Sequence, residues 1–442
     1  MFVDASAQPV ISRLASNQTH WVRMVLLAAL GLTVLGGCGR ARNAVPVELV
    51  PEARLAGYPD VRGWWENPQP VENSLRNAIR QSVRGEDGAS SENSGSYDVL
   101  CLSGGGAGGA FGAGLLCGWS EAGNRPEFFL VTGVSTGALI APFAFLGREY
   151  DGVLRRFSSG LSTRDIMTKR PLVSLALGAD SIASSAPLAR LLEECVDDRV
   201  VAAVAREHAR GRRLFIGTTH LDAGRLVVWD MGAIAASGRS DAPDLFRKVM
   251  LASASIPVAF PAQYFHVEAN GQSYDEMHVD GGVMAEVFLY GVALDAQKLW
   301  QDADQPSGPR GRVYVVRNGY LRVPGQPTRP GLMSIGERAI HGFLGAKATG
   351  DVYHVHALAS RDGMDFNLAY VPEDLVTEQK EAFDPNVMGQ LFTFGQNLAR
   401  NGFPWQKTPP GLDPSNAGSP LLTARPAPSQ PPQPENVASA SR

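Results

Sequence analysis

Apolar residues in the middle of the chain occur in short, nearly unbroken runs separated by longer segments of mixed character. Three runs, DVLCLS (98–103), EFFLVTG (127–133) and GRVYVVRNG (311–319), show little alternation of polar and apolar positions. That pattern is typical of short strands buried on both faces of a sheet. We therefore expect these runs to be core strands.

Helical segments follow the first two of these runs. AFGAGLLCGWSEAG should form a helix that closes at Gly123, and TGALIAPFAFLG should form a second helix, which Pro142 kinks or shifts at its start. A third helix is expected over APDLFRKVMLASAS, starting near Pro243. The alternation of strands and helices predicts an α/β fold, with a three-layer α/β/α arrangement and a mostly parallel central sheet.

Two hairpins are predicted beside the parallel strands. RRLFIGTTHL and RLVVWDM flank a turn at residues 222–224. QYFHVE and SYDEMHVD flank Asn270-Gly271, a dipeptide that favours the tight turns of hairpins. Antiparallel pairs should therefore extend the sheet.

The N-terminal region contains an apolar stretch, MVLLAALGLTVLGGC, which follows Arg23 and ends at Cys38. It is short for a membrane-spanning helix and fits a secretory signal. Its end, LGGC, resembles a bacterial lipobox, which implies cleavage before Cys38 and lipidation of the thiol. Gly39 is not the aspartate of an inner-membrane retention signal, so a lipid anchor in the cell envelope is expected, at the outer membrane or facing the periplasm. The alternative is an ordinary signal peptide that contains a cysteine.

Charge and cysteine content narrow the possible partners. The formal net charge of the 442 residues is -4, and nucleic-acid binding usually needs a basic patch, so no nucleic-acid partner is expected. Three cysteines follow Cys38 and cannot all pair internally: Cys101, Cys117 and Cys195. We expect buried free thiols, although one disulfide remains open.

The second core run leads directly into Gly133-Val134-Ser135-Thr136-Gly137. A serine on a tight strand-to-helix turn exposes its hydroxyl in a strained backbone conformation, and glycines two residues before and after it relieve the crowding. The first N–H groups of the following helix then lie beside the serine. This G-x-S-x-G segment predicts that Ser135 is a nucleophile.

A glycine-rich loop, LSGGGAGGAFGAGLL, follows the first core run. Gly104, Gly106 and Gly109 match the G-x-G-x-x-G pattern of dinucleotide-binding loops, but the expected acidic residue at the end of the next strand is replaced by the Ser135 turn. No Gly-Lys-Ser/Thr follows, which excludes a P-loop. The favoured interpretation is an oxyanion hole built from backbone N–H groups. A nucleotide-binding enzyme remains as an alternative.

The third motif is Asp280-Gly281-Gly282. A glycine-rich loop, then G-x-S-x-G, then D-G-[AG], with ASASIPVAFPA between the last two, resembles the patatin-like phospholipases. The resemblance covers roughly residues 97 to 295.

The resemblance implies a Ser–Asp dyad without histidine, in which Ser135 attacks and Asp280 accepts the proton. It also implies a lipid or phospholipid substrate, acyl ester hydrolysis, and no metal or cofactor. The implied oxyanion hole comprises Gly104, Gly105, Gly106 and Thr136, and the remaining motif glycines are Gly109, Gly133, Gly137, Gly281 and Gly282.

One position departs from the family pattern. Gly108 stands where the family often has Arg or Lys late in the glycine loop. Neutral esters and phospholipids therefore both remain candidate substrates. A non-catalytic lipid-binding envelope lipoprotein on the same scaffold is the alternative to a hydrolase.

Histidines near these motifs have simpler interpretations. His278 could act as a triad base, but a partly exposed strand histidine is favoured under the dyad. His354 and His356 are expected on one face of a strand, facing solvent or core, because two ligands alone make a poor zinc site.

Two further features are interpreted as structural. An acidic run is expected to be a solvated helix face: Glu193, Glu194, Asp197 and Asp198. Thr219 is expected to pack in the sheet, and the alternative is that it borders the active site.

The expected division of the chain follows from these motifs. It comprises a signal peptide (1–37), a lipidated N-terminal segment and linker (38–96), the catalytic domain (97–295), the C-terminal part of the α/β domain (296–410) and a disordered Pro/Ser-rich tail (411–442).

Overall fold

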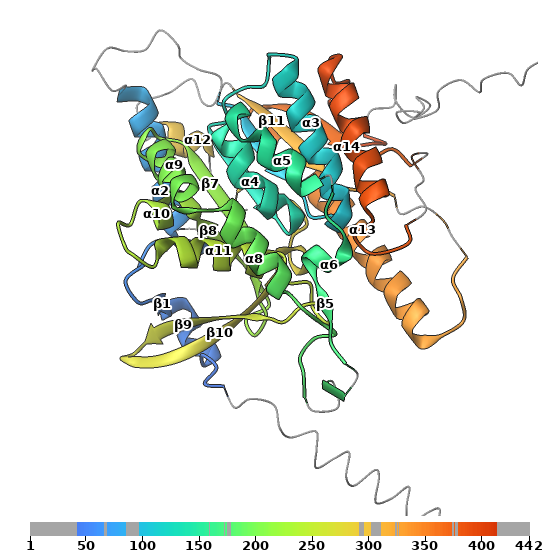
Figure 1. Cartoon of the computed structure of the whole chain (residues 1–442). Helices are drawn as coiled ribbons and strands as arrows, with labels where there is room; N and C mark the ends of the chain where they lie inside the picture. The colour runs from blue at the N-terminus through green and yellow to red at the C-terminus, as the bar shows by residue number, and fades with distance from the viewer. Residues whose placement is uncertain are drawn as a thin grey trace, which may run out of the picture.

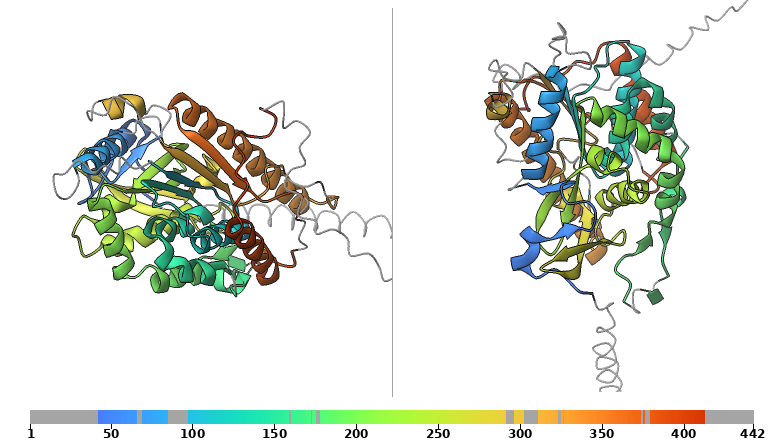
Figure 2. Two further views of the ribbon diagram at one scale, coloured as in Figure 1. Left: turned by 90° about the horizontal axis from the view of Figure 1, so that it is seen from above. Right: turned by 90° about the vertical axis from the view of Figure 1, so that its left-hand side faces the viewer.

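The computed structural model describes residues 42–412, apart from residues 66–68, 85–96, 159, 172, 175–177, 291–295, 302–310, 323–324, 326, 374 and 376–378. Figure 1 shows a twisted central sheet with helices packed against it, and the turned views in Figure 2 show helices on both faces. The predicted signal peptide, Cys38, the linker over 85–96 and all but the first two residues of the predicted tail lie outside the described residues.

The centre of the sheet is parallel. Its five strands lie in the order β7-β4-β3-β11-β12, and each neighbouring pair is parallel. The strands are β3 (Val99–Leu102), β4 (Leu130–Val134), β7 (Arg213–His220), β11 (Arg312–Arg317) and β12 (Asp365–Tyr370). The three apolar runs thus supply three adjacent core strands, and the predicted parallel core is confirmed.

Antiparallel strands extend the sheet beyond β7. They are β1 (Arg54–Leu55), β2 (Arg62–Trp64), β8 (Arg225–Asp230), β9 (Gln263–Ala269) and β10 (Gln272–Asp280). Both predicted hairpins are present, as β7–β8 and β9–β10. Asn270 and Gly271 have φ values of 52° and 73°, the left-handed conformation that a two-residue hairpin turn requires. Strands β1 and β2 pair with β9 and β8, so the segment before the linker belongs to the same sheet.

Helices cover both faces, and the sheet separates two apolar cores. Leu100 and Leu102 of β3 face one core, while Val99 and Cys101 face the other. The first core is covered by α3 (Gly109–Glu121), α4 (Thr136–Leu146), α5 (Asp151–Ser158), α8 (Ala186–Cys195), α9 (Asp198–Ala209), α10 (Met231–Ala235), α11 (Ala242–Ser253) and α14 (Pro385–Arg400). The second is covered by α2 (Gln69–Arg84), α12 (Ala296–Gln301) and α13 (Leu332–Arg361). This arrangement confirms the three-layer prediction.

Short elements complete the fold. A short helix, α6 (Thr163–Ile166), precedes a small separate sheet of β5 (Thr168–Lys169) and β6 (Ala183–Ser184). Short 3-10 segments occur at η1 (Val47–Glu52), η2 (Gly106–Gly108), η3 (Arg148–Tyr150) and η4 (Gly281–Val283). No helix in the described part of the chain is both long enough and apolar enough to cross a bilayer.

The structure corrects one local prediction and removes one of the two alternatives in another. His354 and His356 lie in α13 rather than on a strand, so residues two apart point in different directions. The His354 ring packs edge-on against Trp65, and the His356 ring packs against Phe366. The alternation VYHVHAL imitates a strand, but it is embedded in a long helical segment. Pro142 does not shift the start of α4, which runs from Thr136 through the proline to Leu146.

Candidate active site

Ser135 occupies the turn between β4 and α4. Its backbone has φ 53° and ψ -125°, a region that non-glycine residues rarely adopt, so the predicted strain is present. A Cβ atom on Gly133 would lie 2.7 Å from the Gly137 carbonyl oxygen, and one on Gly137 would lie 2.4 Å from the Leu102 carbonyl oxygen. Both glycines are therefore required for the turn to close.

The sheet topology brings Asp280 to this serine. Val134, the last residue of β4, pairs with Gly217 of β7, while Asp280, the last residue of β10, pairs with the adjacent Thr218. Strand β4 is parallel to β7 and β10 is antiparallel to it, so the two carboxyl ends meet end to end along β7. Ser135 and Asp280 face each other because β4 and β10 share one neighbour.

The two side chains form a direct hydrogen bond. Ser135 Oγ donates to Asp280 Oδ2 at 2.6 Å, and the Gly282 N–H donates to Asp280 Oδ1 at 2.8 Å. Thr219 Oγ1 donates to the Asp280 carbonyl oxygen at 2.9 Å, so this buried threonine packs in the sheet and also borders the site. The second carboxylate oxygen is thus held by the backbone while the first accepts from the hydroxyl. Such a pair can transfer a proton from serine to aspartate.

His278 does not join this pair. Its Nδ1 lies 2.9 Å from Thr218 Oγ1 and its Nε2 lies 3.1 Å from Glu276 Oε2, so both ring nitrogens are engaged away from Ser135. The expectation of a partly exposed histidine is wrong, because the side chain is completely buried. The rings of Trp229 and Phe265 enclose it.

Burial sets the electrostatics of the proposed base. Asp280 is 5% exposed, and burial raises the pKa of its carboxyl to about 7, with a smaller upward contribution from the charge of Glu286. The hydrogen bond from Ser135 acts in the opposite direction because it favours the carboxylate. A carboxyl group with a pKa near neutrality can both accept and return a proton under ordinary conditions.

The glycine-rich loop lies beside the dyad in a conformation available only to glycine. Gly105 has φ 153°, and a Cβ atom there would lie 1.7 Å from the Asn318 carbonyl oxygen. The Gly104 N–H donates to the Glu286 carbonyl oxygen at 2.9 Å, which removes this N–H from the predicted oxyanion hole. The N–H groups of Gly105, Gly106 and Thr136 are the predicted donors that remain, and the first N–H groups of α4 have no acceptor within the helix.

Two other motif glycines bring the neighbouring segments into close contact. A Cβ atom on Gly109 would lie 2.3 Å from Thr136 Oγ1, so α3 and α4 begin against each other. A Cβ atom on Gly108 would lie 2.3 Å from the Asn318 carbonyl oxygen. The absence of Arg or Lys at this position therefore has a steric reason, since the Asn318 backbone fills the space.

A buried ion pair supports the loop and was missed in the sequence analysis. Arg317, the last residue of β11, donates to the Gly104 carbonyl oxygen at 2.7 Å and lies 3.5 Å from Glu286 Oε2. Glu286 Oε1 would contact a Cβ atom on Gly282 at 2.6 Å, so its carboxylate lies against the motif of Asp280. The signals were an arginine ending a buried strand and a glutamate six residues after Asp280, and neither fits a recognised motif.

The pH dependence of the predicted ester hydrolysis should report this arrangement. In the predicted dyad, Asp280 must be ionised to accept the proton, so kcat/KM on a soluble ester should fall about tenfold per pH unit below about pH 7. Glu286→Gln removes a charge that raises the pKa of Asp280, so the acid limb should move to lower pH. Steady-state pH profiles of both proteins measure this, and a limb that stays in place or rises would contradict it.

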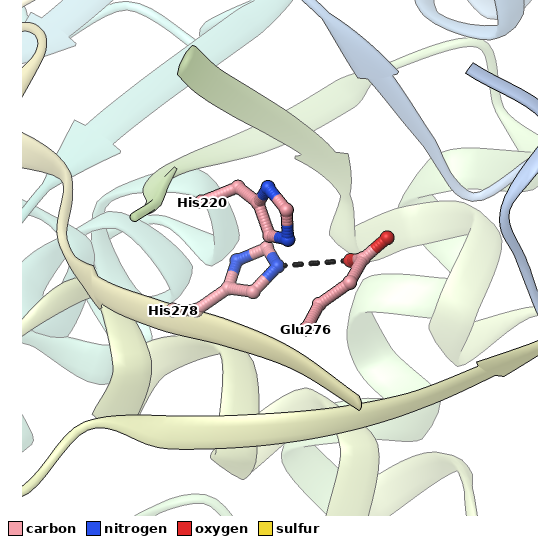
Figure 3. Close-up of side chains that lie close together, drawn as sticks. All are labelled: His220, Glu276 and His278. Carbon is pink, nitrogen blue, oxygen red and sulfur yellow. Dashed lines mark hydrogen bonds and ion pairs between the residues drawn. The ribbon is translucent and has the colours of Figure 1, made fainter. Parts of the chain in front are cut away.

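A second polar cluster lies in the neighbouring part of the sheet. Figure 3 shows His220, Glu276 and His278, whose potential ligand atoms all lie within 4.8 Å of one another. Two imidazoles and a carboxylate are a known metal-ligand set. However, both carboxylate oxygens of Glu276 accept hydrogen bonds from Arg62, so a cation would lie against a guanidinium group. These residues fit a buried ion pair better than a metal site.

Protonation states agree with that ion pair. Burial lowers the pKa of His278 to about 4 and also lowers the pKa of His220, so both rings are neutral near pH 7. Burial alone would raise the pKa of Glu276, but the charge of Arg62 and the contacts of His278 hold it below its usual range.

The remaining predictions concern the surface and the cysteines. The four acidic residues at the junction of α8 and α9 are exposed, as expected, and Asp197 caps α9 by accepting from the Val200 N–H at 3.0 Å. Cys101, Cys117 and Cys195 are buried free thiols, also as expected.

Comparison with known proteins gives two findings. Residues 100–291 match the family model described as patatin-like phospholipase. Among solved structures, the chain is similar to VipD from Legionella pneumophila, with 11% identity, a TM-score of 0.29, and coverage of 68% of this chain and 67% of VipD. No curated protein matches the sequence.

Proposed function

We propose that the chain, whose residues 100–291 match the family model of patatin-like phospholipases, is a lipase or phospholipase A that cleaves lipid acyl esters through a Ser135–Asp280 dyad. The domain implies lipid acyl hydrolysis in general. The observation that carries the dyad is the 2.6 Å hydrogen bond from Ser135 Oγ to Asp280 Oδ2, made from a strained turn at the start of a helix.

Acylation would begin with proton transfer. Asp280 accepts the proton of Ser135 Oγ as that oxygen attacks the ester carbonyl carbon, and the carbonyl oxygen becomes an oxyanion. N–H groups of Gly105, Gly106 and Thr136 would stabilise this charge, and each such donor is worth about 10²–10³-fold in rate. When the tetrahedral intermediate collapses, the alcohol leaves with the proton from Asp280, and the acyl group remains on Ser135.

Deacylation would use the same groups in reverse. A water molecule attacks the acyl carbonyl while Asp280 accepts one of its protons. Collapse of the second intermediate returns that proton to Ser135 Oγ and releases the carboxylic acid. The near-neutral pKa of Asp280 suits a group that must accept and return a proton in each half-reaction.

We further propose that Cys38 carries a lipid anchor in the cell envelope. The support is the LGGC sequence that follows an apolar stretch and a basic residue. Such an anchor would hold the domain beside its substrate.

The two alternative functions are less well supported. The intact dyad and its backbone hydrogen bonds argue against a scaffold that only binds lipid. A nucleotide phosphate bound at the glycine loop would face the carboxyl groups of Asp280 and Glu286, which disfavours a negatively charged ligand there. The Gly104 N–H could not bind the phosphate either, because it already donates to the Glu286 carbonyl oxygen.

Hydrolysis of p-nitrophenyl esters across a ladder of acyl chain lengths tests the proposed function. We expect turnover of at least one ester and a chain-length optimum that identifies the preferred acyl group. Phosphatidylcholine vesicles, with release of fatty acid as the readout, test the phospholipase activity separately. A wild-type protein that is inert on every ester and on vesicles would contradict the proposal and favour the lipid-binding alternative.

A further inference from the structure

Exposed apolar side chains occur on the N-terminal half of α13. Ile335, Ile340 and Phe343 are 56%, 53% and 63% exposed. Figure 1 shows this half of α13 projecting from the lower right of the molecule. Large apolar side chains that remain in water without a protein partner often mark a binding surface.

Connectivity places this half of α13 beyond the active-site edge of the sheet. Helix α13 links the parallel strands β11 and β12, so it runs antiparallel to them and begins at their carboxyl ends. Lys347 pairs with Asp351, whose Oδ2 accepts the Glu286 N–H at 2.7 Å, and this turn is therefore level with the dyad. At 1.5 Å per residue, the preceding part of α13 extends about 22 Å further.

A second apolar group lies on the same edge. Val258 is 64% exposed and Ile182 is 45% exposed, and the Ile182 N–H donates to the Val258 carbonyl oxygen at 2.8 Å. Val258 has φ 70°, a strained conformation for a β-branched residue. Ser255 of the same loop accepts the Asp280 N–H at 2.8 Å, so this loop is attached directly to the catalytic strand.

The start of the described chain reaches this edge as well. Arg42 pairs with Asp222 in the turn after β7, and the Asn43 carbonyl oxygen accepts the Asp275 N–H at 2.7 Å. That turn follows the carboxyl end of β7. Because β4 is parallel to β7, this is the edge of the sheet at which β4 leads into Ser135.

We propose that the active-site edge docks on a lipid bilayer through two projections: Ile335, Ile340 and Phe343 on α13, and Ile182 with Val258. The inference rests on the proposed function, which requires acyl lipid to reach Ser135. It also rests on the Arg42–Asp222 ion pair, because the proposed anchor at Cys38 precedes Arg42 by four residues in the sequence and would bring this edge to the membrane. Apolar side chains at such a boundary insert into the interface between headgroups and acyl chains.

An environment-sensitive dye tests the docking surface without relying on catalysis. The dye is attached to the cysteine of Phe343→Cys in a full chain that also carries Ser135→Ala. The labelled protein is then reconstituted into phosphatidylcholine vesicles. Leu412→Cys is the matched control, since Leu412 is 50% exposed and closely follows Pro410, whose carbonyl oxygen accepts a hydrogen bond from Tyr353 in the C-terminal half of α13. The Ser135→Ala chain without an added cysteine gives the background labelling, because its described cysteines are buried.

We expect dye at position 343 to shift to the blue, to be quenched by spin-labelled lipid and to resist aqueous iodide. Dye at position 412 should show the reverse. Equal accessibility of both dyes to iodide would overturn the proposal. Energy transfer between dyes at position 343 on different chains would also overturn it, in favour of a contact between two copies.

Activity gives a second readout. Ile340→Ser/Phe343→Ser should lower the ratio of vesicle-lipid to p-nitrophenyl acetate hydrolysis by about tenfold, because two apolar groups no longer enter the bilayer. Leu412→Ser should keep the wild-type ratio, and an unchanged ratio in the double variant would count against docking. If the wild type hydrolyses no ester while dye at position 343 still enters the bilayer, the proposed function fails and the docking surface stands.

Discussion

Ser135→Ala is expected to lower ester hydrolysis by at least about 10⁴-fold, because the variant has no nucleophile to form an acyl intermediate. Asp280→Asn should lower it by about 10³–10⁴-fold, since the amide cannot accept the proton of Ser135. The two effects should not add, because both residues serve one step. Initial rates on the best p-nitrophenyl ester, for each variant and for the double variant, measure this.

Folding must be intact for these rates to be interpreted. Ser135 is almost buried, and alanine keeps its Cβ atom, so far-ultraviolet circular dichroism and thermal unfolding should stay close to wild type. Ser255→Ala is a useful control, because among the described residues the one bond that Ser255 Oγ makes is to the Leu251 carbonyl oxygen, at 2.8 Å. Near wild-type activity in Ser135→Ala would show that another residue is the nucleophile.

The dyad shows how far sequence reasoning extends. The turn around Ser135 follows from the local sequence, because the glycines that relieve it lie within two residues. The meeting with Asp280 does not, since it depends on β4 and β10 sharing one neighbour, β7. In the sequence, the family resemblance alone connects these two distant residues. A helical or strand pattern by itself carries no information about which strand ends become adjacent.

Burial was the property that sequence patterns predicted least well. His278 has polar neighbours in sequence and was expected near solvent, but the β8 and β9 strands supply the rings that enclose it. Glu286 and Arg317 lie far apart in sequence and would each be expected on the surface, yet they form a buried pair. Their charges are tolerated inside because each has a partner, and partners are assigned by topology.

This buried pair gives the glycine loop its shape. Arg317 holds the Gly104 carbonyl oxygen, and Glu286 holds the Gly104 N–H through its own carbonyl oxygen. The loop is thereby fixed at Gly104, and a Cβ atom at that position would lie 3.2 Å from the Ser135 Cβ atom. Preorganised donors of this kind stabilise a developing charge without reorganising during the reaction. The proposed role of the loop as an oxyanion hole would therefore depend on the backbone conformation of Gly105.

Gly105→Ala is expected to lower kcat by about 10²–10³-fold while leaving Ser135 and Asp280 in place. The added methyl group would lie 1.7 Å from the Asn318 carbonyl oxygen, and at φ 153° the backbone is closed to alanine, so the loop must move. Displacing one or two oxyanion donors accounts for the size of the loss. Gly106→Ala is the matched control, because a Cβ atom there meets nothing within 4 Å and its φ of 55° costs alanine about 1–2 kcal/mol.

The two glycine variants separate the oxyanion loop from general destabilisation. Gly106→Ala should retain kcat within about tenfold of wild type, and both proteins should still react with a fluorophosphonate probe, because the dyad survives in each. Gly105→Ala should lose kcat with little change in KM, since the oxyanion forms only in the transition state. Equal losses of kcat in the two variants would contradict this prediction. They would show that the substitutions act by destabilising the loop and not by displacing the N–H donors that Gly105 positions.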